Sequence, residues 1–109
     1  MPMELPEVIA GYLASANAHD AEACASFFTE DAIVHDEGQE RRGLTAIREW
    51  KEEVSRKYRP VISASDVTKA AEKIIVKAKV AGDFQGSPID LHFAFTLRGD
   101  KIARLEITP

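Results

Sequence analysis

Asp36 is the residue of this chain best placed to do chemistry. It follows the short apolar run 32–34 and precedes Gly38, a pattern that predicts a strand over about residues 32–37 with a carboxylate at its end. A carboxylate in an apolar pocket has its charged form desolvated, which makes it a stronger base. We therefore expect Asp36 to point into a cavity and to act as a general base.

The histidines and the cysteine offer few alternatives. Neighbouring strand side chains point to opposite faces, so His35 and Asp36 cannot form a catalytic dyad. His35 and Glu37 share a face, as metal ligands could, but no third ligand lies at a useful spacing. Cys24 stands among apolar residues and is predicted to be a small core residue. We predict no metal and no cofactor.

Three helices are predicted in the first sixty residues. Pro6 suits the first turn of a helix over about residues 6–17, in which apolar residues recur at helical spacing. Asp20 is a good N-cap for a short second helix. Gly38 and Gly43 bracket a polar turn, and a longer helix follows until a proline stops it. The apolar face of this third helix comprises Ile47, Trp50, Val54 and Tyr58.

Beyond Pro60 the apolar period changes from 3.6 to 2. Residues 73–80 and 91–97 alternate between apolar and polar, and turns containing glycine separate the strands and leave a final strand over about 101–108. Helices followed by a strand meander indicate an α+β fold. We predict a single domain over residues 1–109, with three N-terminal helices packed on a strongly curved, mainly antiparallel β-sheet that forms a conical pocket.

The pocket follows from the curvature of the sheet. Helices cannot cover a strongly curved sheet along its whole length, so one end stays open, lined by apolar side chains and a few polar groups. The alternative is that most of these side chains simply fill the core. The side chains predicted to line the pocket beside Asp36 are Tyr12, Phe28, Val34, Trp50, Val54, Tyr58, Phe84, Leu91 and Phe93.

Three motifs resemble the nuclear transport factor 2-like superfamily, which includes ketosteroid isomerase and the SnoaL-like polyketide cyclases. They are Tyr12-Leu13-x-x-x-Asn17-Ala18-x-Asp20, then Phe28-x-x-Asp31-Ala32-x-Val34-x-Asp36, and then Gly43-x-x-Ala46-Ile47-Arg48-Glu49-Trp50. The resemblance covers nearly the whole chain. It specifies the fold well and the reaction poorly, because the superfamily also hosts dehydratases, epoxide hydrolases and domains that only bind.

The resemblance implies roles for two residues. In the isomerases a tyrosine on the first helix and a protonated aspartate on a late strand bind the substrate oxygen, while an aspartate closing the first strand moves the proton. Tyr12 and Asp36 match the first and last of these positions. The late-strand position falls on Leu91, and Asp90 points to the opposite face. Because the loss of one such donor costs about 3 kcal/mol, steroid isomerisation is not expected.

Three functions compete at this point. The first is an isomerase, cyclase or dehydratase-type enzyme acting on an apolar carbonyl or hydroxylated metabolite, with Asp36 as general base and Tyr12 as hydrogen-bond donor. The second is a non-catalytic domain that binds a small apolar or amphipathic molecule in the same pocket, which the missing third acid favours. The third is a dimeric structural module with a vestigial pocket.

Composition excludes two classes of partner. The net charge is −4 and the basic residues of the third helix alternate with acidic ones, whereas nucleic-acid binding needs a clustered positive face. There is no export signal and no apolar run of membrane-spanning length. We therefore expect neither nucleic acid nor a membrane as partner, and a cytoplasmic location.

A homodimer through the outer face of the sheet is predicted as well. The side chains that alternate onto one face of the strands carry less charge than a face exposed to water should, which suits an interface. The superfamily that the chain resembles also forms dimers in this way. The set comprises Ile62, Ala64, Asp66, Thr68, His92, Ala94 and Thr96.

Overall fold

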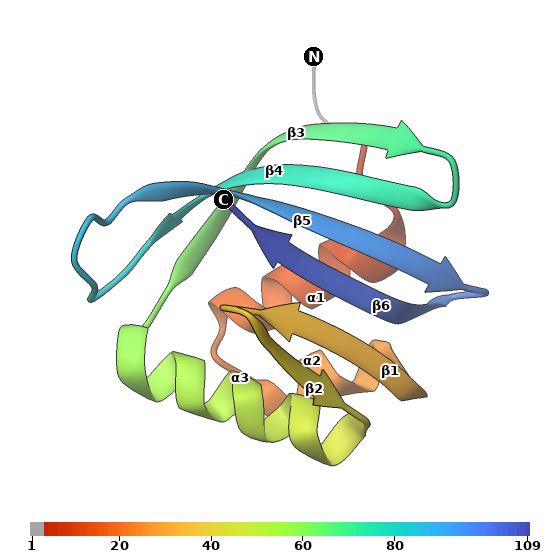
Figure 1. Ribbon diagram of the computed structural model, residues 1–109, viewed down its shortest axis with the longest axis horizontal. Helices are drawn as coiled ribbons and strands as arrows, with labels where there is room; N and C mark the ends of the chain where they lie inside the picture. Colours follow the sequence, from red (N-terminus) through yellow and green to blue (C-terminus); the bar gives the residue numbers. More distant parts are fainter. Residues whose placement is uncertain (1–3) are drawn as a thin grey trace.

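A computed structural model describes residues 4–109 as helices packed on one six-stranded sheet (Figure 1). In chain order the elements are α1 (Glu7–Asn17), α2 (Ala21–Ser26), β1 (Phe28–Asp36), β2 (Gln39–Arg42), α3 (Leu44–Tyr58), β3 (Val61–Ala70), β4 (Lys73–Ala81), β5 (Ile89–Arg98) and β6 (Lys101–Thr108). The predicted α+β fold is confirmed. Within the described residues no helix is long and apolar enough to span a membrane.

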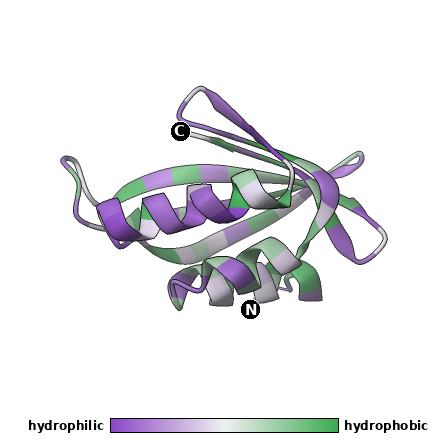
Figure 2. Cartoon of the chain, turned by 90° about the horizontal axis from the view of Figure 1, so that it is seen from below, coloured by the Kyte–Doolittle hydropathy of each residue, from purple (hydrophilic) through white to green (hydrophobic). Residues whose placement is uncertain are grey.

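The sheet is curved and unclosed, with strand order β2-β1-β6-β5-β4-β3. The β1–β6 pair is parallel, and the other pairs of neighbouring strands are antiparallel. Apolar and polar residues alternate along the strands, which Figure 2 shows as successive green and purple bands. The inward set packs against α1 and α3, and its fully buried members include Val76, Phe95 and Leu105. Because successive side chains of a strand point to opposite faces, an apolar residue at every second position places one face of each strand in the core.

The segment between Gly38 and Gly43 is not a polar turn, as the sequence suggested, but the short strand β2. Asp36 pairs with Gln39, so the hairpin has a two-residue loop formed by Glu37 and Gly38. Both loop residues have positive φ, 54° and 73°, as a type I′ turn requires. Asp36 is therefore the last residue of β1 before a tight turn, which restrains its backbone.

A bulge in β3 changes which residues face outward. The pairing with β4 shifts between Ala64 and Asp66, so Ser65 is the extra residue and the side-chain alternation resumes out of step beyond it. Ile62 is buried and Ala64 packs against the core, whereas Asp66 and Thr68 are exposed. The predicted outer-face set was therefore wrong for Ile62 and Ala64, because no sequence pattern marked the bulge.

Asn17 ties the end of α1 to the start of β3. Its side-chain amide donates to the carbonyl of Ile62 at 2.9 Å, and its side-chain oxygen accepts from the backbone N–H of Ile62 at 2.7 Å. Because β3 is the edge strand of the sheet, these two backbone groups of Ile62 would otherwise lack a strand partner. Both are satisfied by one side chain.

Asn17→Ala removes both hydrogen bonds and leaves two partly buried backbone groups unpaired. We expect a loss of about 1–3 kcal/mol in the free energy of unfolding, measured by urea denaturation. Ser26→Ala, at an exposed position of α2, is the control and should change it by less than about 0.5 kcal/mol. An unchanged unfolding midpoint for Asn17→Ala would show that the sheet edge holds without this contact.

The homodimer stays a prediction, with its surface now redefined. Ile75 and Ala94 are directly paired on the outer face and half-buried, and the Lys73–Glu106 ion pair of 3.0 Å lies beside them. We expect sedimentation velocity to give a dimer at tens of micromolar, and Ala94→Arg to give a monomer because it places a charge at the centre of this face. Glu49→Lys, exposed on α3, should remain a dimer. A monomeric wild type would contradict the prediction.

Candidate functional site

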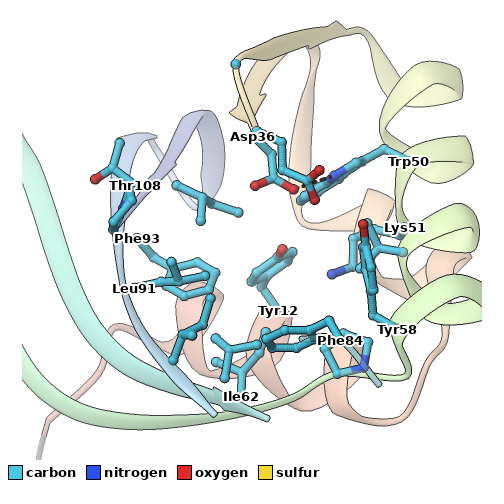
Figure 3. Close-up of a pocket in the computed structure, with 18 residues that line it drawn as sticks. Tyr12, Asp36, Trp50, Lys51, Tyr58, Ile62, Phe84, Leu91, Phe93 and Thr108 are labelled. Carbon is cyan, nitrogen blue, oxygen red and sulfur yellow. Dashed lines mark hydrogen bonds between the residues drawn. The ribbon is translucent and has the colours of Figure 1, made fainter. Parts of the chain in front are cut away.

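A cavity of about 470 Å³ opens between α1, α3 and the inner face of β3–β6 (Figure 3). It lies at the end of the sheet where β1 ends and where β6 reaches the C-terminus. Its walls are mostly apolar, and Tyr12, Asp36 and Lys51 are among the polar residues that line it. The lining residues are Tyr12, Asp36, Glu37, Gly38, Trp50, Lys51, Val54, Tyr58, Pro60, Ile62, Val80, Phe84, Ile89, Leu91, Phe93, Ile107, Thr108 and Pro109.

Two of the side chains predicted to line this cavity lie elsewhere. Phe28 is buried in the closed core, with its ring edge-to-face against Tyr12 at a centroid distance of 5.5 Å. Val34 faces the same side of β1 as Asp36 but lies two residues earlier. It is paired with Leu105 and fully buried. The closed part of the core therefore extends further toward the cavity than predicted. The other predicted residues do line it: Tyr12, Asp36, Trp50, Val54, Tyr58, Phe84, Leu91 and Phe93.

Trp50 holds the Asp36 carboxylate in place. The indole Nε1–H of Trp50 donates to Oδ2 of Asp36 at 3.0 Å, from α3 to the end of β1. The hairpin turn that follows Asp36 restrains its backbone, and this bond orients its carboxylate. Within residues 4–109 no side-chain hydrogen bond engages Oδ1, so one oxygen is oriented and the other is available to a ligand. The sequence predicted Trp50 only as an apolar wall.

Tyr12 presents an unpaired hydroxyl to the cavity. Its ring is fully buried, packed edge-to-face against Phe28 and Phe95, and its hydroxyl makes no hydrogen bond within the described residues. Burial raises the pKa of Tyr12 well above its ordinary value, with further upward contributions from Cys24 and Asp36. Tyr12 is therefore a neutral donor. No hydrogen bond joins it to Asp36, although both groups point into the cavity (Figure 3).

Lys51 is the residue that sequence reasoning missed. Its side chain is only 4% exposed, and its amine lies 4.8 Å from the ring centroid of Trp50 and 5.4 Å from that of Tyr12. Burial lowers the pKa of Lys51, while Cys24 and Asp36 act in the opposite direction. Lys51 stands four residues after Ile47 and seven before Tyr58, which is the apolar face of α3. Its spacing could have identified it.

The mouth of the cavity is fastened to the end of α3. The backbone N–H of Asp83 donates to the carbonyl of Tyr58 at 2.7 Å, and the rings of Tyr58 and Phe84 meet edge-to-face at 5.9 Å. A Cβ at Gly82 would lie 2.6 Å from that carbonyl oxygen, so only glycine lets the β4–β5 loop approach this closely. Ile107 at the end of β6, which the sequence did not single out, completes the wall.

Comparison with known proteins identifies the family. The SnoaL-like domain family model matches residues 9–105. A candidate polyketide cyclase from Sinorhizobium meliloti is 36% identical, with a TM-score of 0.91 and coverage of 95% of each chain. The chain belongs to the SnoaL-like family, within the nuclear transport factor 2-like superfamily. None of the curated proteins matches it.

More distant structures share the fold. A protein of ketosteroid isomerase-like fold from Catenulispora acidiphila, in complex with trimethylamine, is 18% identical with a TM-score of 0.86, covering 97% of this chain and 87% of that one. The epoxide hydrolase/cyclase-like enzyme SalBIII of pyran ring formation in salinomycin is 22% identical with a TM-score of 0.81, covering 94% and 87%. At these identities the likeness concerns the fold alone.

Lys51→Met should stabilise the protein. An ammonium buried without an ion pair costs free energy that an apolar side chain of similar length does not, so we expect a gain of about 1–3 kcal/mol in the free energy of unfolding at neutral pH. Because the folded-state pKa of Lys51 is depressed, the unfolded chain holds this proton more tightly. The wild type therefore becomes more stable as the pH rises and Lys51 loses its proton. The difference in free energy of unfolding between Lys51→Met and the wild type should shrink toward the pH range where lysine titrates.

Lys57→Met is the matched control for this comparison. Lys57 also stands over an aromatic ring, 5.4 Å from the centroid of Tyr58, but it is exposed. Its substitution should change the free energy of unfolding by less than about 0.5 kcal/mol. Urea denaturation at several pH values measures both variants. A destabilised Lys51→Met would show that the buried amine is a structural contact of the core.

Proposed function

We propose that this protein is an isomerase- or cyclase-type enzyme that removes a proton next to the carbonyl group of an apolar metabolite, with Asp36 as the general base. The observation that carries the proposal is the Asp36 carboxylate, held by Trp50 at 3.0 Å through one oxygen, at the wall of a largely apolar cavity. A base that is held in one orientation beside an apolar cavity suits proton transfer from carbon.

The reaction begins with the free oxygen of Asp36. Oδ1 takes a proton from the carbon beside the carbonyl, and the electron pair of that C–H bond moves toward the carbonyl oxygen. The Tyr12 hydroxyl donates a hydrogen bond to this oxygen as negative charge develops on it. Trp50 keeps Oδ2 engaged, so the carboxylate does not rotate away from the substrate.

Two outcomes of the same enolate separate isomerase from cyclase. If the substrate is a β,γ-unsaturated carbonyl compound, the enolate is a dienolate. Asp36 then returns its proton to the γ-carbon, the double bond moves into conjugation with the carbonyl, and the product is an isomer. If the enolate carbon attacks a second carbonyl of the same molecule, a ring closes and the proton ends on the new alkoxide. The candidate polyketide cyclase at 36% identity favours ring closure, and the cavity of about 470 Å³ suits a metabolite of a few fused or flexible rings.

Proton exchange tests the first step without knowledge of the natural substrate. With 2-indanone as probe in D₂O, we expect the wild type to accelerate incorporation of deuterium beside the carbonyl, followed by NMR. Asp36→Asn should reduce this acceleration by roughly 100-fold or more, because an amide cannot accept the proton. The fold should be retained, since the amide oxygen still accepts from the Trp50 indole.

Asp90→Asn is the control for the exchange experiment. Asp90 is exposed on the outer face of β5, and its neighbour Leu91 faces the cavity, so the variant should exchange at the wild-type rate. Exchange that survives in Asp36→Asn would remove Asp36 as the base. A wild type that binds the ketone without accelerating exchange would favour the non-catalytic binding domain instead.

A further inference from the structure

Two donors beside the cavity find no acceptor within residues 4–109. The Tyr12 hydroxyl makes no hydrogen bond within residues 4–109, and the Lys51 amine makes neither a hydrogen bond nor an ion pair to any described residue. Buried polar groups are paired in the great majority of cases. Two unpaired donors beside the same cavity are therefore a feature that folding does not explain.

Geometry places these donors together. The Lys51 amine lies 5.4 Å from the centroid of the Tyr12 ring, and Figure 3 shows both polar ends directed into the cavity, the amine from α3 and the hydroxyl from α1. An oxygen atom of a ligand lying between them could accept from both. Asp36 stands on a different part of the wall, and no ion pair links it to Lys51, so the amine is not neutralised internally.

The charge of the amine defines the kind of oxygen that fits. An ammonium nine-tenths buried among Trp50 and Tyr12 is stabilised by their ring faces only in part, and a buried charge gains most from a ligand of opposite sign. The surrounding wall is apolar, with Ile62, Leu91 and Phe93 facing the same space. The matching ligand has an anionic oxygen on an apolar body.

We propose that Lys51 and Tyr12 form a two-donor site for an anionic oxygen of the substrate, either a carboxylate or the enolate of an acidic carbonyl compound. This inference deepens the proposed function, because it names the substrate class of the same cavity. It also supplies from α3 the second donor that the chain lacks at Leu91. A carbonyl compound bound in this way turns its oxygen toward Lys51 and Tyr12 and a neighbouring carbon toward Asp36.

Binding of a matched pair of probes tests the site without any turnover. 2-Naphthoate and 2-naphthamide have the same shape and differ in charge. By isothermal titration at pH 7, we expect the wild type to bind the naphthoate about tenfold or more tightly than the amide, the effect of one hydrogen bond to a charged group. Lys51→Met should abolish this preference while still binding the amide, and Tyr12→Phe should reduce it.

Control variants separate this site from the other charges near the cavity. Lys57→Met removes an exposed lysine of the same helix and should keep the full preference. Asp90→Asn removes an exposed carboxylate on the outer face of β5 and should also keep the full preference. Failure of the proton-transfer proposal would therefore show in exchange, and failure of the anion site in these binding ratios.

A second probe distinguishes an enolate from a carboxylate as the bound group. 6-Cyano-2-naphthol resembles an enol, and its absorption spectrum reports whether it is ionised. We expect the wild type to bind it as the naphtholate at a pH where the free compound is neutral, and Lys51→Met to bind it un-ionised. Ionised binding supports the enolate, and selective binding of the naphthoate alone supports the carboxylate. Equal binding of naphthoate and naphthamide, a preference that survives in Lys51→Met, or no binding of either at millimolar concentration would overturn the proposal.

Discussion

The two hydrogen bonds between the Asn17 side chain and the backbone of Ile62 set the relation of the first helix to the sheet. They join the end of α1 to the edge strand β3 at 2.9 and 2.7 Å, so the sheet cannot flatten away from the helix at that edge. One turn and a half earlier on α1 stands Tyr12, and Ile62 itself lines the cavity. The same contact that completes the edge strand therefore fixes the distance between two walls of the site.

The site combines polar groups that act against stability. A buried tyrosine hydroxyl and a buried lysine amine that find no partner within residues 4–109 each carry a desolvation cost, and both line the cavity beside Asp36. The other members of the buried core cluster are apolar side chains, together with Cys24 and Trp50. Local departures from good packing and pairing of this kind are typical of functional positions, where binding rather than folding selects the residue.

Periodicity predicted the elements that depend on one repeating face. Each of these patterns is supported by several residues, so a single exception did not change the prediction. Examples are the alternation in β4 and β5 and the apolar face of α3 at Ile47, Trp50 and Tyr58. The strand β2 was missed because its four residues are polar on both faces, which leaves only the turn residues as evidence. The bulge at Ser65 was missed for a related reason, since one inserted residue changes parity without changing composition.

The site was predictable only where family motifs and strand parity coincided. Asp36 and Leu91 follow from strand parity combined with the family motifs. The division between cavity wall and closed core at Phe28 and Val34 depends on how far α3 covers β1, which no local pattern specifies. Lys51 was overlooked because charged residues on a surface helix are ordinarily solvated.

Its position repeats the helical spacing of the apolar face, so the same periodicity that identified α3 also assigns Lys51 to its inner side. The distinction matters for chemistry. In the proposed reaction Asp36 acts on the carbon of the substrate, whereas Lys51 and Tyr12 donate to its oxygen from another part of the wall. In this proposal Lys51 on α3 determines which way the substrate oxygen points. In the isomerases that the chain resembles, the second acid lies on a late strand, on the opposite wall.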